Sequence, residues 1–302
     1  MHKFGRTGNY QDTCGEPVME KICGRPLGLA FVDGAAYARY VKRMEDPTFF
    51  PDSKMLLVAD AYKGLILMDA FGKATKVFDT VGPRRIRFLN SLAVKENGEV
   101  YLTDSSRRHY RRDVHLEVLE RKPTGRLLHF NPVTTRVSVL ATDLSFPNGV
   151  TLVDDEKALL VALTNQNKLV KFDLKTKKME DFAFLPGPPD NIWIETSDDN
   201  KSKKLFVGLT SLQPVWHLWV MGQPKVRKLM DIAIPPKYLR EIASPHGAFV
   251  TVDLSSGDVT NVYKSSDGAA RFLSGVHGVG DYYYLTTWNQ DSITRIPKKA
   301  FA

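Results

Sequence analysis

The chain has 302 residues, of which 43% are hydrophobic and 25% are charged, a composition that excludes an intrinsically disordered protein. Its 42 Lys and Arg residues outnumber its 34 Asp and Glu residues, giving a formal net charge of +8, and its length suits one large domain or two modest ones. The longest apolar run is the six-residue segment Ala158–Leu163, whereas a membrane-spanning helix needs roughly 18 residues, so the sequence contains no predicted membrane span.

The basic residues fall in short groups between apolar runs, which favours solvated loops over a nucleic-acid-binding surface. The densest group is Arg107-Arg108-His109-Tyr110-Arg111-Arg112, in which cationic and aromatic residues alternate closely enough to grip phosphates. No recognised nucleic-acid-binding module surrounds this group. We therefore expect no nucleic-acid partner.

Along the chain, short apolar runs bounded by Gly, Asp, Asn and Pro recur in place of helical periodicity, which indicates an all-β protein. The runs repeat as a unit, and each unit opens on a turn-forming or polar residue before an apolar one. The five openings are Gly28-Leu29, Asn90-Ser91-Leu92, Asn148-Gly149-Val150, Asp190-Asn191-Ile192 and His277-Gly278-Val279. The second strands that follow them are residues 56–60, 100–104, 159–163, 205–209 and 283–287.

Third strands with more open alternation complete the pattern in each unit. They are residues 64–69, 125–130, 168–173, 247–252 and 291–296. A fourth, edge-like strand is visible in four of the five units, for example at residues 136–140 and 258–263. Short strands repeated in fours predict a β-propeller, because a sandwich would leave the repetition to chance.

The fifth unit ends after its third strand, so either a five-bladed ring closes unusually or an N-terminal blade is missing. We expect residues 1–302 to form a single propeller domain. Within its first unit, residues 33–53 predict a protruding, inserted loop. Its aromatic residues Tyr37, Tyr40, Phe49 and Phe50 would suit a partner or lipid surface.

The two cysteines, Cys14 and Cys23, do not have the spacing of a zinc site, and no further cysteine exists to complete one. They are either two reduced thiols or one short disulfide, and a disulfide would imply an oxidising compartment. Asn200-Lys201-Ser202 is a glycosylation sequon in a polar, loop-like stretch. This sequon favours the oxidising compartment.

Several long motifs resemble one family. The sequence is similar to the strictosidine synthase-like proteins, most of all to the branch of the adipocyte plasma membrane-associated proteins, in order from about Cys14 to about Arg295. The motifs that carry the resemblance are residues 23–29, 59–65, 101–106, 125–128, 146–150 and 185–192.

The resemblance implies a six-bladed propeller related to paraoxonases and gluconolactonases. Family members usually carry an N-terminal membrane anchor or signal segment and a first blade ahead of this chain's start, so we expect an N-terminally truncated chain. Membrane association would then use a segment absent from this chain, in a full-length protein of the secretory pathway, membrane-associated or extracellular. The paired cysteines of the family fall on Cys14 and Cys23, which favours the disulfide.

The polar residues at the unit openings are the candidate metal ligands. Asn90, Asn148, Asp190 and Asn191 would supply amide and carboxylate oxygens, and Ca²⁺ binds six to eight such hard oxygens. In paraoxonase-like relatives, the corresponding motifs bind a catalytic calcium that polarises an ester or lactone carbonyl, and the resemblance implies the same role here. The relatives' glutamate ligand belongs to the missing blade. The same residue types also form turns that cap strand ends.

His277 opens the last unit and is the candidate catalytic base, because imidazole titrates near neutrality and could deprotonate a calcium-bound water. His246 is a second candidate base, although its place before an outer strand favours a loop residue. The plant synthase branch places a catalytic glutamate at the start of the last blade, whereas residues 274–280 contain no carboxylate here. This departure argues against strictosidine synthesis.

The sequence therefore predicts a calcium-dependent hydrolase that acts on a small aryl ester or lactone. Two alternatives stay open. One is a non-catalytic propeller scaffold, membrane-associated or secreted, and the other is a disfavoured condensation of the strictosidine synthase type.

Overall fold

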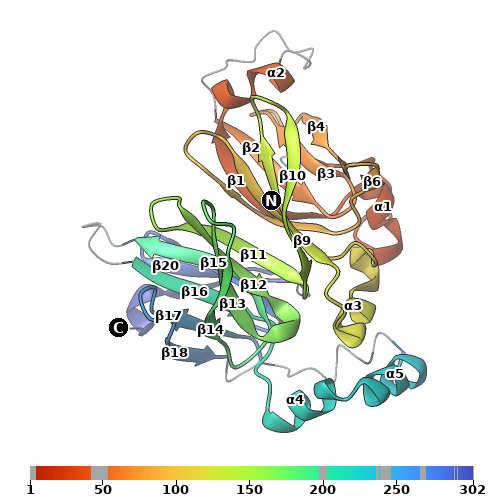
Figure 1. The fold of residues 1–302 in the computed structure, drawn as a ribbon, viewed down its shortest axis with the longest axis vertical. Helices are drawn as coiled ribbons and strands as arrows, with labels where there is room; N and C mark the ends of the chain where they lie inside the picture. The colour runs from red at the N-terminus through yellow and green to blue at the C-terminus, as the bar shows by residue number, and fades with distance from the viewer. Residues whose placement is uncertain are drawn as a thin grey trace. The chain divides into compact units, whose positions relative to one another are not determined.

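The computed structural model describes residues 5–41, 54–196, 203–235, 238, 246–265, 270–288, 290 and 292–301. The chain divides into two compact units, each described here by itself. One comprises Met1–Val114 and Pro123–Pro147, and the other comprises His115–Lys122 and Asn148–Ala302. Figure 1 shows the strands of both units as short antiparallel blades.

The first unit contains two four-stranded blades. The first blade is formed, in order, by β1 (Pro26–Asp33), β2 (Lys54–Asp60), β3 (Gly64–Met68) and β4 (Ala74–Phe78). The second blade is formed by β7 (Leu89–Val94), β8 (Val100–Asp104), β9 (Gly125–Asn131) and β10 (Arg136–Leu144). The ribbon β5 (Thr80–Val81) and β6 (Arg84–Arg85) and the helices η1 (Pro17–Met19), α1 (Glu20–Cys23), η2 (Gly34–Tyr37), α2 (Ala38–Val41) and η3 (Arg111–Asp113) complete the unit.

The second unit contains two further four-stranded blades and one of three strands. The third blade is formed by β11 (Pro147–Val153), β12 (Ala158–Leu163), β13 (Lys168–Asp173) and β14 (Met179–Phe184). The fourth is formed by β15 (Pro189–Thr196), β16 (Lys203–Leu209), β17 (Ala248–Val252) and β18 (Val259–Lys264), and the fifth by β19 (Leu273–Val279), β20 (Tyr282–Thr287) and β21 (Thr294–Pro297). The helices are α3 (Val114–Glu120), η4 (Thr164–Gln166), α4 (Val215–Gly222), α5 (Pro224–Ala233) and η5 (Lys298–Phe301).

This arrangement confirms the predicted β-propeller fold. The five sequence repeats form five blades, and four of these blades have a fourth strand. Strands whose two faces are both covered are buried throughout: all six residues of β12 are buried, and so are all five of β3 and all five of β17. The outer strand β18 has only exposed and partly buried residues. A sixth blade stays a prediction.

A register shift occurs at the start of the innermost strand of a blade. The pairing with the second strand slips between Pro26 and Gly28, between Leu89 and Leu92, between Pro189 and Ile192, and between Leu273 and Gly275. Such an irregularity bends the strand and re-aims the side chain beside it. The residue in the second position of these strands, and of β11, is Leu27, Asn90, Asn148, Asp190 or Ser274.

The first part of the inserted segment 33–53 is folded onto the first unit. Asp33 caps η2 by accepting a hydrogen bond from Ala35 N, at 2.9 Å. Tyr37 is fully buried and donates its hydroxyl to Gly98 O at 2.9 Å, and Tyr40, which is 4% exposed, packs against Phe130. The prediction that these two tyrosines offer a partner or lipid surface was therefore wrong, because the rings fill the core of this unit. Phe49 and Phe50 lie outside the described residues.

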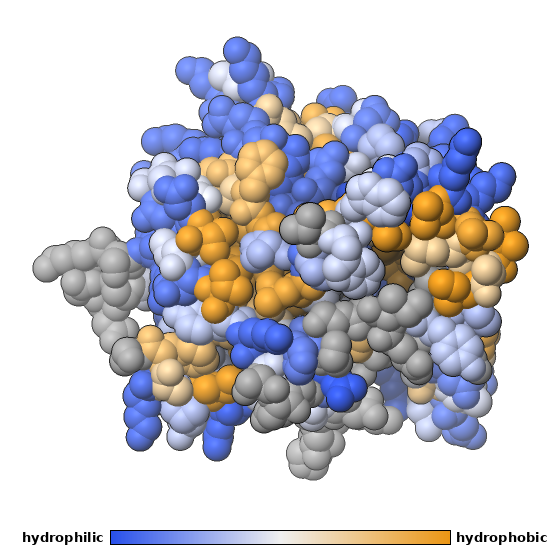
Figure 2. Space-filling view, turned by 90° about the horizontal axis from the view of Figure 1, so that it is seen from below, coloured by the Kyte–Doolittle hydropathy of each residue, from blue (hydrophilic) through white to orange (hydrophobic). Residues whose placement is uncertain are grey.

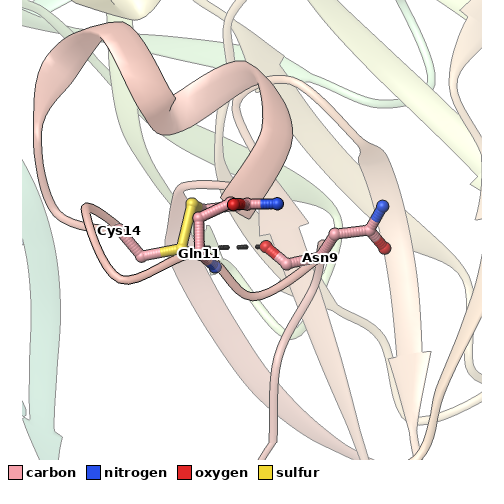
Figure 3. Close-up of a disulfide and its surroundings, with 4 residues drawn as sticks. Asn9, Gln11 and Cys14 are labelled. Carbon is pink, nitrogen blue, oxygen red and sulfur yellow. Dashed lines mark hydrogen bonds between the residues drawn. A yellow bond between two sulfur atoms is a disulfide. The ribbon is translucent and has the colours of Figure 1, made fainter.

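Cys14 and Cys23 form a disulfide, which confirms the pairing that the family resemblance implied (Figure 3). Gln11 N donates a hydrogen bond to Cys14 Sγ at 3.1 Å. The same sulfur lies 3.7 Å from Asn9 O, a contact without a donated proton because a disulfide sulfur carries none. The bridge closes the segment that leads into α1. Asn200, the predicted glycosylation site, lies outside the described residues.

Helix α1 presents a buried carboxylate to the rest of the first unit. Glu20, which is 3% exposed, accepts hydrogen bonds from Tyr62 Oη and from Arg111 Nη1, both at 2.8 Å. Arg107, from the same basic group as Arg111, donates to Thr124 O and to Asp143. These arginines of the densest basic group are therefore engaged by the protein itself.

Helices α4 and α5, inserted between β16 and β17, were not predicted from the sequence. Pro224 stands in the first turn of α5, where a missing backbone N–H costs nothing. Arg227 of α5 donates to Leu119 O of α3 at 2.6 Å and to Met221 O of α4 at 2.5 Å. Within the described part of the chain, every helix is too short or too polar to cross a membrane.

Candidate functional site

Three of the four predicted ligands are buried polar residues in the second position of an innermost strand. Asn90 is 7% exposed, Asn148 is 5% exposed and Asp190 is 9% exposed, while Asn191, one residue further along, is partly buried. Buried polar groups need hydrogen-bonding or ionic partners to repay their lost hydration. Their partners therefore indicate which atoms each side chain can offer to a ligand.

In the first unit, a serine fixes the amide of Asn90. Asn90 Nδ2 donates to Ser105 Oγ at 2.9 Å, and Ser105 Oγ donates to Pro147 O at 2.7 Å. A hydroxyl has a single proton, so Ser105 must accept from the asparagine once its own proton is committed. The amide NH₂ of Asn90 therefore faces Ser105, and its carbonyl oxygen lies on the other side of the amide.

The second unit repeats this arrangement one blade later. Asn148 Nδ2 donates to Thr164 Oγ1 at 3.3 Å, and Thr164 Oγ1 donates to Pro189 O at 2.7 Å. Pro189 immediately precedes Asp190, so the relay joins the opening of the third blade to that of the fourth. The same hydroxyl argument assigns the amide nitrogen of Asn148 to Thr164 and places the carbonyl oxygen on the other side of the amide.

Close backbone packing brings the openings of the third and fourth blades together. A Cβ atom on Gly149 would lie 2.6 Å from Asp190 O and 2.8 Å from Asn191 Cα, so only glycine allows this approach. The structure therefore places Asn148, Asp190 and Asn191 on adjoining strand starts. Asn90 lies in the other unit, where its amide nitrogen faces Ser105 as that of Asn148 faces Thr164.

The fifth blade adds Ser274 and Gly275 beside this group. Ser274 Oγ lies 2.9 Å from Thr286 Oγ1 within hydrogen-bond distance. A Cβ atom on Gly275 would lie 3.5 Å from Asn191 Cβ and 3.5 Å from His277 Nε2. Gly275 therefore stands between the predicted ligand and the predicted base.

His277 does not open its strand, contrary to the sequence prediction. It is the fifth residue of β19, and Ser274 occupies the position that corresponds to Asp190. The predicted alignment was three residues out because His277-Gly278-Val279 imitates Asn148-Gly149-Val150, the opening of the third blade. The His277 ring packs 5.8 Å from the Trp193 ring, between centroids.

The His277 environment favours the neutral ring. His277 is an exposed residue, yet partial desolvation of its ring by the surrounding protein lowers the pKa of His277 below its ordinary value of 6.5. Desolvation disfavours the charged form of an imidazole. At neutral pH, His277 can therefore accept a proton.

The donor set fits calcium better than zinc. Among the described residues, no group of three or more His, Cys, Asp and Glu side chains could hold a metal. Calcium also accepts amide and backbone carbonyl oxygens, which suits a set of asparagines around one aspartate. Within the second unit, Asn148, Asp190 and Asn191 supply two amide oxygens and one carboxylate from adjoining strand starts, so these residues fit the ion that the sequence predicted.

A cavity of about 380 Å³ lies elsewhere, in the first unit, and none of the predicted site residues lines it. Its cationic side chains are Lys21, Lys63, Lys76 and Arg85. Asp79 pairs with two of them, at 3.1 Å from Lys76 Nζ and 2.9 Å from Arg85 Nη2. This cavity has no link to the chemistry of the strand openings.

Ser105 and Thr164 are the site residues that the sequence analysis missed. Each follows directly after a second strand, β8 or β12, so aligning the units at that position would have found them. The buried pair of Asp104 and Arg126 was also missed. Asp104 Oδ2 accepts from Arg126 Nε at 3.0 Å and from Nη2 at 2.5 Å, next to the start of β7.

Solved structures with the same fold include proteins of several functions. A gluconolactonase of Xanthomonas campestris superposes with a TM-score of 0.52 at 15% identity, over 77% of this chain and 65% of that chain. The calcium-binding protein regucalcin of Agrobacterium tumefaciens gives 0.51 at 16% identity, over 78% and 66%. A chain of the nidogen/laminin complex gives 0.51 at 12% identity, over 82% and 73%. These likenesses show the fold alone.

Relatives identified by sequence share a higher identity with this chain than these solved structures do. Protein STRICTOSIDINE SYNTHASE-LIKE 13 of Arabidopsis thaliana is 33% identical over 73% of this chain, which spans 50% of that protein. Protein STRICTOSIDINE SYNTHASE-LIKE 10 of the same plant is 30% identical over 90% of this chain and 70% of its own length. The human Adipocyte plasma membrane-associated protein is 28% identical over 93% of this chain and 65% of its own length.

The sequence model of the family described as Strictosidine synthase matches residues 90–178, the segment that holds Asn90, Ser105, Asn148 and Thr164. Together with the relatives, this match confirms the resemblance inferred from the sequence motifs. The chain belongs to the strictosidine synthase-like family.

Proposed function

We propose that this propeller is a hydrolase of aryl esters or lactones that uses calcium at the strand openings. The observation that carries the proposal is the pair of hydroxyl relays, Asn90–Ser105–Pro147 and Asn148–Thr164–Pro189, which commit each amide nitrogen to the protein. Each relay fixes which end of the amide faces its hydroxyl, so the carbonyl oxygen is the end that a metal would contact.

In the second unit, Asn148, Asp190 and Asn191 would hold the ion. When bound, Ca²⁺ supplies the Lewis acidity that polarises a carbonyl oxygen. Asp190 provides the carboxylate charge, and the tight contact at Gly149 keeps the backbone of the two strand starts fixed. Preorganised donors cost no reorganisation during the reaction.

His277 is the proposed general base of this reaction. Its neutral ring would take a proton at a ring nitrogen from the attacking water and return it to the leaving alcohol. Gly275 leaves space beside His277 Nε2, which a larger side chain would occupy. The role is compatible with the position of His277 outside the register of the ligand residues.

The compartment follows from the disulfide. Disulfides form and persist in oxidising compartments, and the human relative is named as a plasma membrane-associated protein. We therefore propose that the protein matures in the secretory pathway. Detection of free Cys14 and Cys23 thiols in protein isolated under alkylating conditions would contradict this.

The alternative is a non-catalytic scaffold. The single carboxylate in the donor set favours it, because a site with few charged ligands has a low affinity for calcium. Condensation of the strictosidine synthase type stays disfavoured, because residues 274–280 of β19 and its turn contain no carboxylate.

The test is hydrolysis of phenyl acetate and of a simple γ-lactone, measured with added Ca²⁺ and with excess chelator. Asn148→Ala should abolish the calcium-dependent turnover, whereas Leu27→Ala, at the same strand position in the first blade, should leave it intact. Calcium-dependent melting in the absence of turnover would favour the scaffold. If calcium changes neither the turnover nor the melting temperature, in this chain and in an N-terminally extended one, the proposed calcium site is refuted.

A further inference from the structure

Helices α4 and α5 expose an unusual amount of apolar surface. Five large apolar side chains on these two helices are at least 47% exposed. They are Trp216 at 60%, Leu218 at 47%, Trp219 at 65%, Leu229 at 63% and Ile232 at 74%. Single exposed apolar residues are ordinary on protein surfaces, whereas a group this size on one element marks an interaction site.

The inner side of the helix pair is already used by the second unit. Arg227 binds the backbone of α3 and of α4, and Met221 is buried. Residues Lys225, Lys228, Leu229 and Ile232 follow the spacing of one helix face, and all four are exposed. Trp216 and Trp219 likewise lie one turn apart on α4. The outer face therefore carries aromatic and aliphatic residues bordered by lysines.

We propose that the outer face of α4 and α5 binds the interface of a lipid bilayer that contains anionic headgroups. Tryptophan prefers the boundary between headgroups and acyl chains, and lysine stems lie along apolar surface while their ammonium groups reach the headgroups. Lys225 and Lys228 are exposed on this face and outnumber Asp231, the single acidic residue of segment 215–233, so the charge complements an anionic surface.

The figures show how this surface is placed within its unit. The two helices follow β16, whose last residue, Leu209, pairs with Pro189 at the start of β15 (Figure 1). They therefore arise from the end of the fourth blade that also carries Asp190. Figure 2 looks from below, the side on which α4 and α5 lie in Figure 1, and shows apolar side chains exposed beside hydrophilic ones.

The inference does not depend on hydrolase activity, so its test measures binding alone. The full chain is sedimented with vesicles of phosphatidylcholine and with vesicles that also contain 30% phosphatidylserine. We expect binding to the anionic vesicles, lowered at least about tenfold in Trp216→Ser/Trp219→Ser, because each tryptophan buries a large apolar area. Lys225→Ala/Lys228→Ala should lower it about fivefold per lysine.

The matched control is Phe71→Ser/Phe184→Ser, which removes two aromatic side chains that are each 71% exposed outside these helices. It should bind vesicles like the unchanged chain. Circular dichroism confirms that each variant is folded. Tryptophan fluorescence gives a second measurement: spin-labelled lipid should quench the unchanged chain strongly, and the Trp216→Ser/Trp219→Ser variant, which keeps Trp193 and Trp288, should escape quenching.

Equal vesicle binding by the tryptophan variant and the unchanged chain would overturn the proposal. So would an absence of vesicle binding combined with self-association that the tryptophan substitutions abolish, because the face would then be a protein interface.

Discussion

The first and second blades, both in the first unit, have the same strand order and the same register shift at the start of the innermost strand. They differ in the side chain that lies at this shift. Both innermost strands slip their register after the first residue. The second blade places Asn90 there, held by Ser105, whereas the first blade places Leu27, and Ala61 follows its second strand. The register shift is therefore a property of the fold, and the polar pair is an addition that makes a candidate site.

The aspartates at the ends of the second strands show the same contrast. Asp60 accepts hydrogen bonds from the backbone of Tyr62 at 2.8 Å and Lys63 at 2.9 Å, so it closes a turn. Asp104, at the corresponding position, forms a buried ion pair with Arg126. One residue type at one position of the blade therefore stabilises a turn in one case and compensates a buried charge in the other.

The largest expected effect is on the free energy of unfolding when Asp104 and Asp60 are each replaced by alanine. Asp104→Ala should lower the free energy of unfolding of its unit by about 3–5 kcal/mol, because it leaves the Arg126 guanidinium buried without its partner. Asp60→Ala should cost about 1–3 kcal/mol, since it removes acceptors for two backbone N–H groups. Urea unfolding measures both. The double variant Asp104→Ala/Arg126→Met should recover part of the stability that Asp104→Ala loses. Equal losses in Asp104→Ala and Asp60→Ala would show that the assigned difference in roles is wrong.

The next effect tests the hydroxyl relay that the first blade lacks. Thr164→Val keeps the shape of the side chain but removes the acceptor for Asn148 Nδ2, so calcium affinity should fall about 10–100-fold, as it does when orienting partners of metal ligands are lost. Isothermal titration with Ca²⁺ measures this. Thr164→Ser retains the hydroxyl and should bind like the unchanged chain, and an identical loss in both variants would point to packing.

A smaller effect should appear in the pH dependence. Because burial lowers the pKa of His277, the folded ring loses its proton at a lower pH than the unfolded ring, whose pKa is near 6.5. Its contribution to stability is therefore complete above about pH 6.5 and declines as the pH falls below that value. The turnover rate should decrease as the pH falls below 6.5, because protonated His277 cannot accept a proton, and His277→Gln should remove this acidic limb of the pH profile. A limb retained in that variant would exclude His277 as the base.

The smallest effect concerns the exposed counterpart of the Asp104 pair. Asp79 contacts Lys76 and Arg85, whose side chains are 56% and 68% exposed. Solvent screens such pairs, so Asp79→Asn should change the free energy of unfolding by about 0–1 kcal/mol, measured by the same urea titration. A loss comparable to that of Asp104→Ala would show that burial does not separate the two pairs.

Local sequence patterns were sufficient to predict the blades. The strand β8 coincides with the predicted residues 100–104, and the other second strands begin within two residues of their predicted starts. A strand covered on both faces must be apolar throughout, so burial imprints its extent on the local sequence. The disulfide and the family followed from motifs that are equally local.

Tertiary structure alone decided the rest. The amides of Asn90 and Asn148 are fixed by hydroxyls 15 and 16 residues away, and the Tyr37 hydroxyl reaches Gly98 across 61 residues. The opening of β19 falls at Ser274 because the register shift, set by pairing with β20, selects it over His277. Such contacts depend on how separate strands pack, and a side chain's neighbours across strands leave no periodic trace in the sequence around it.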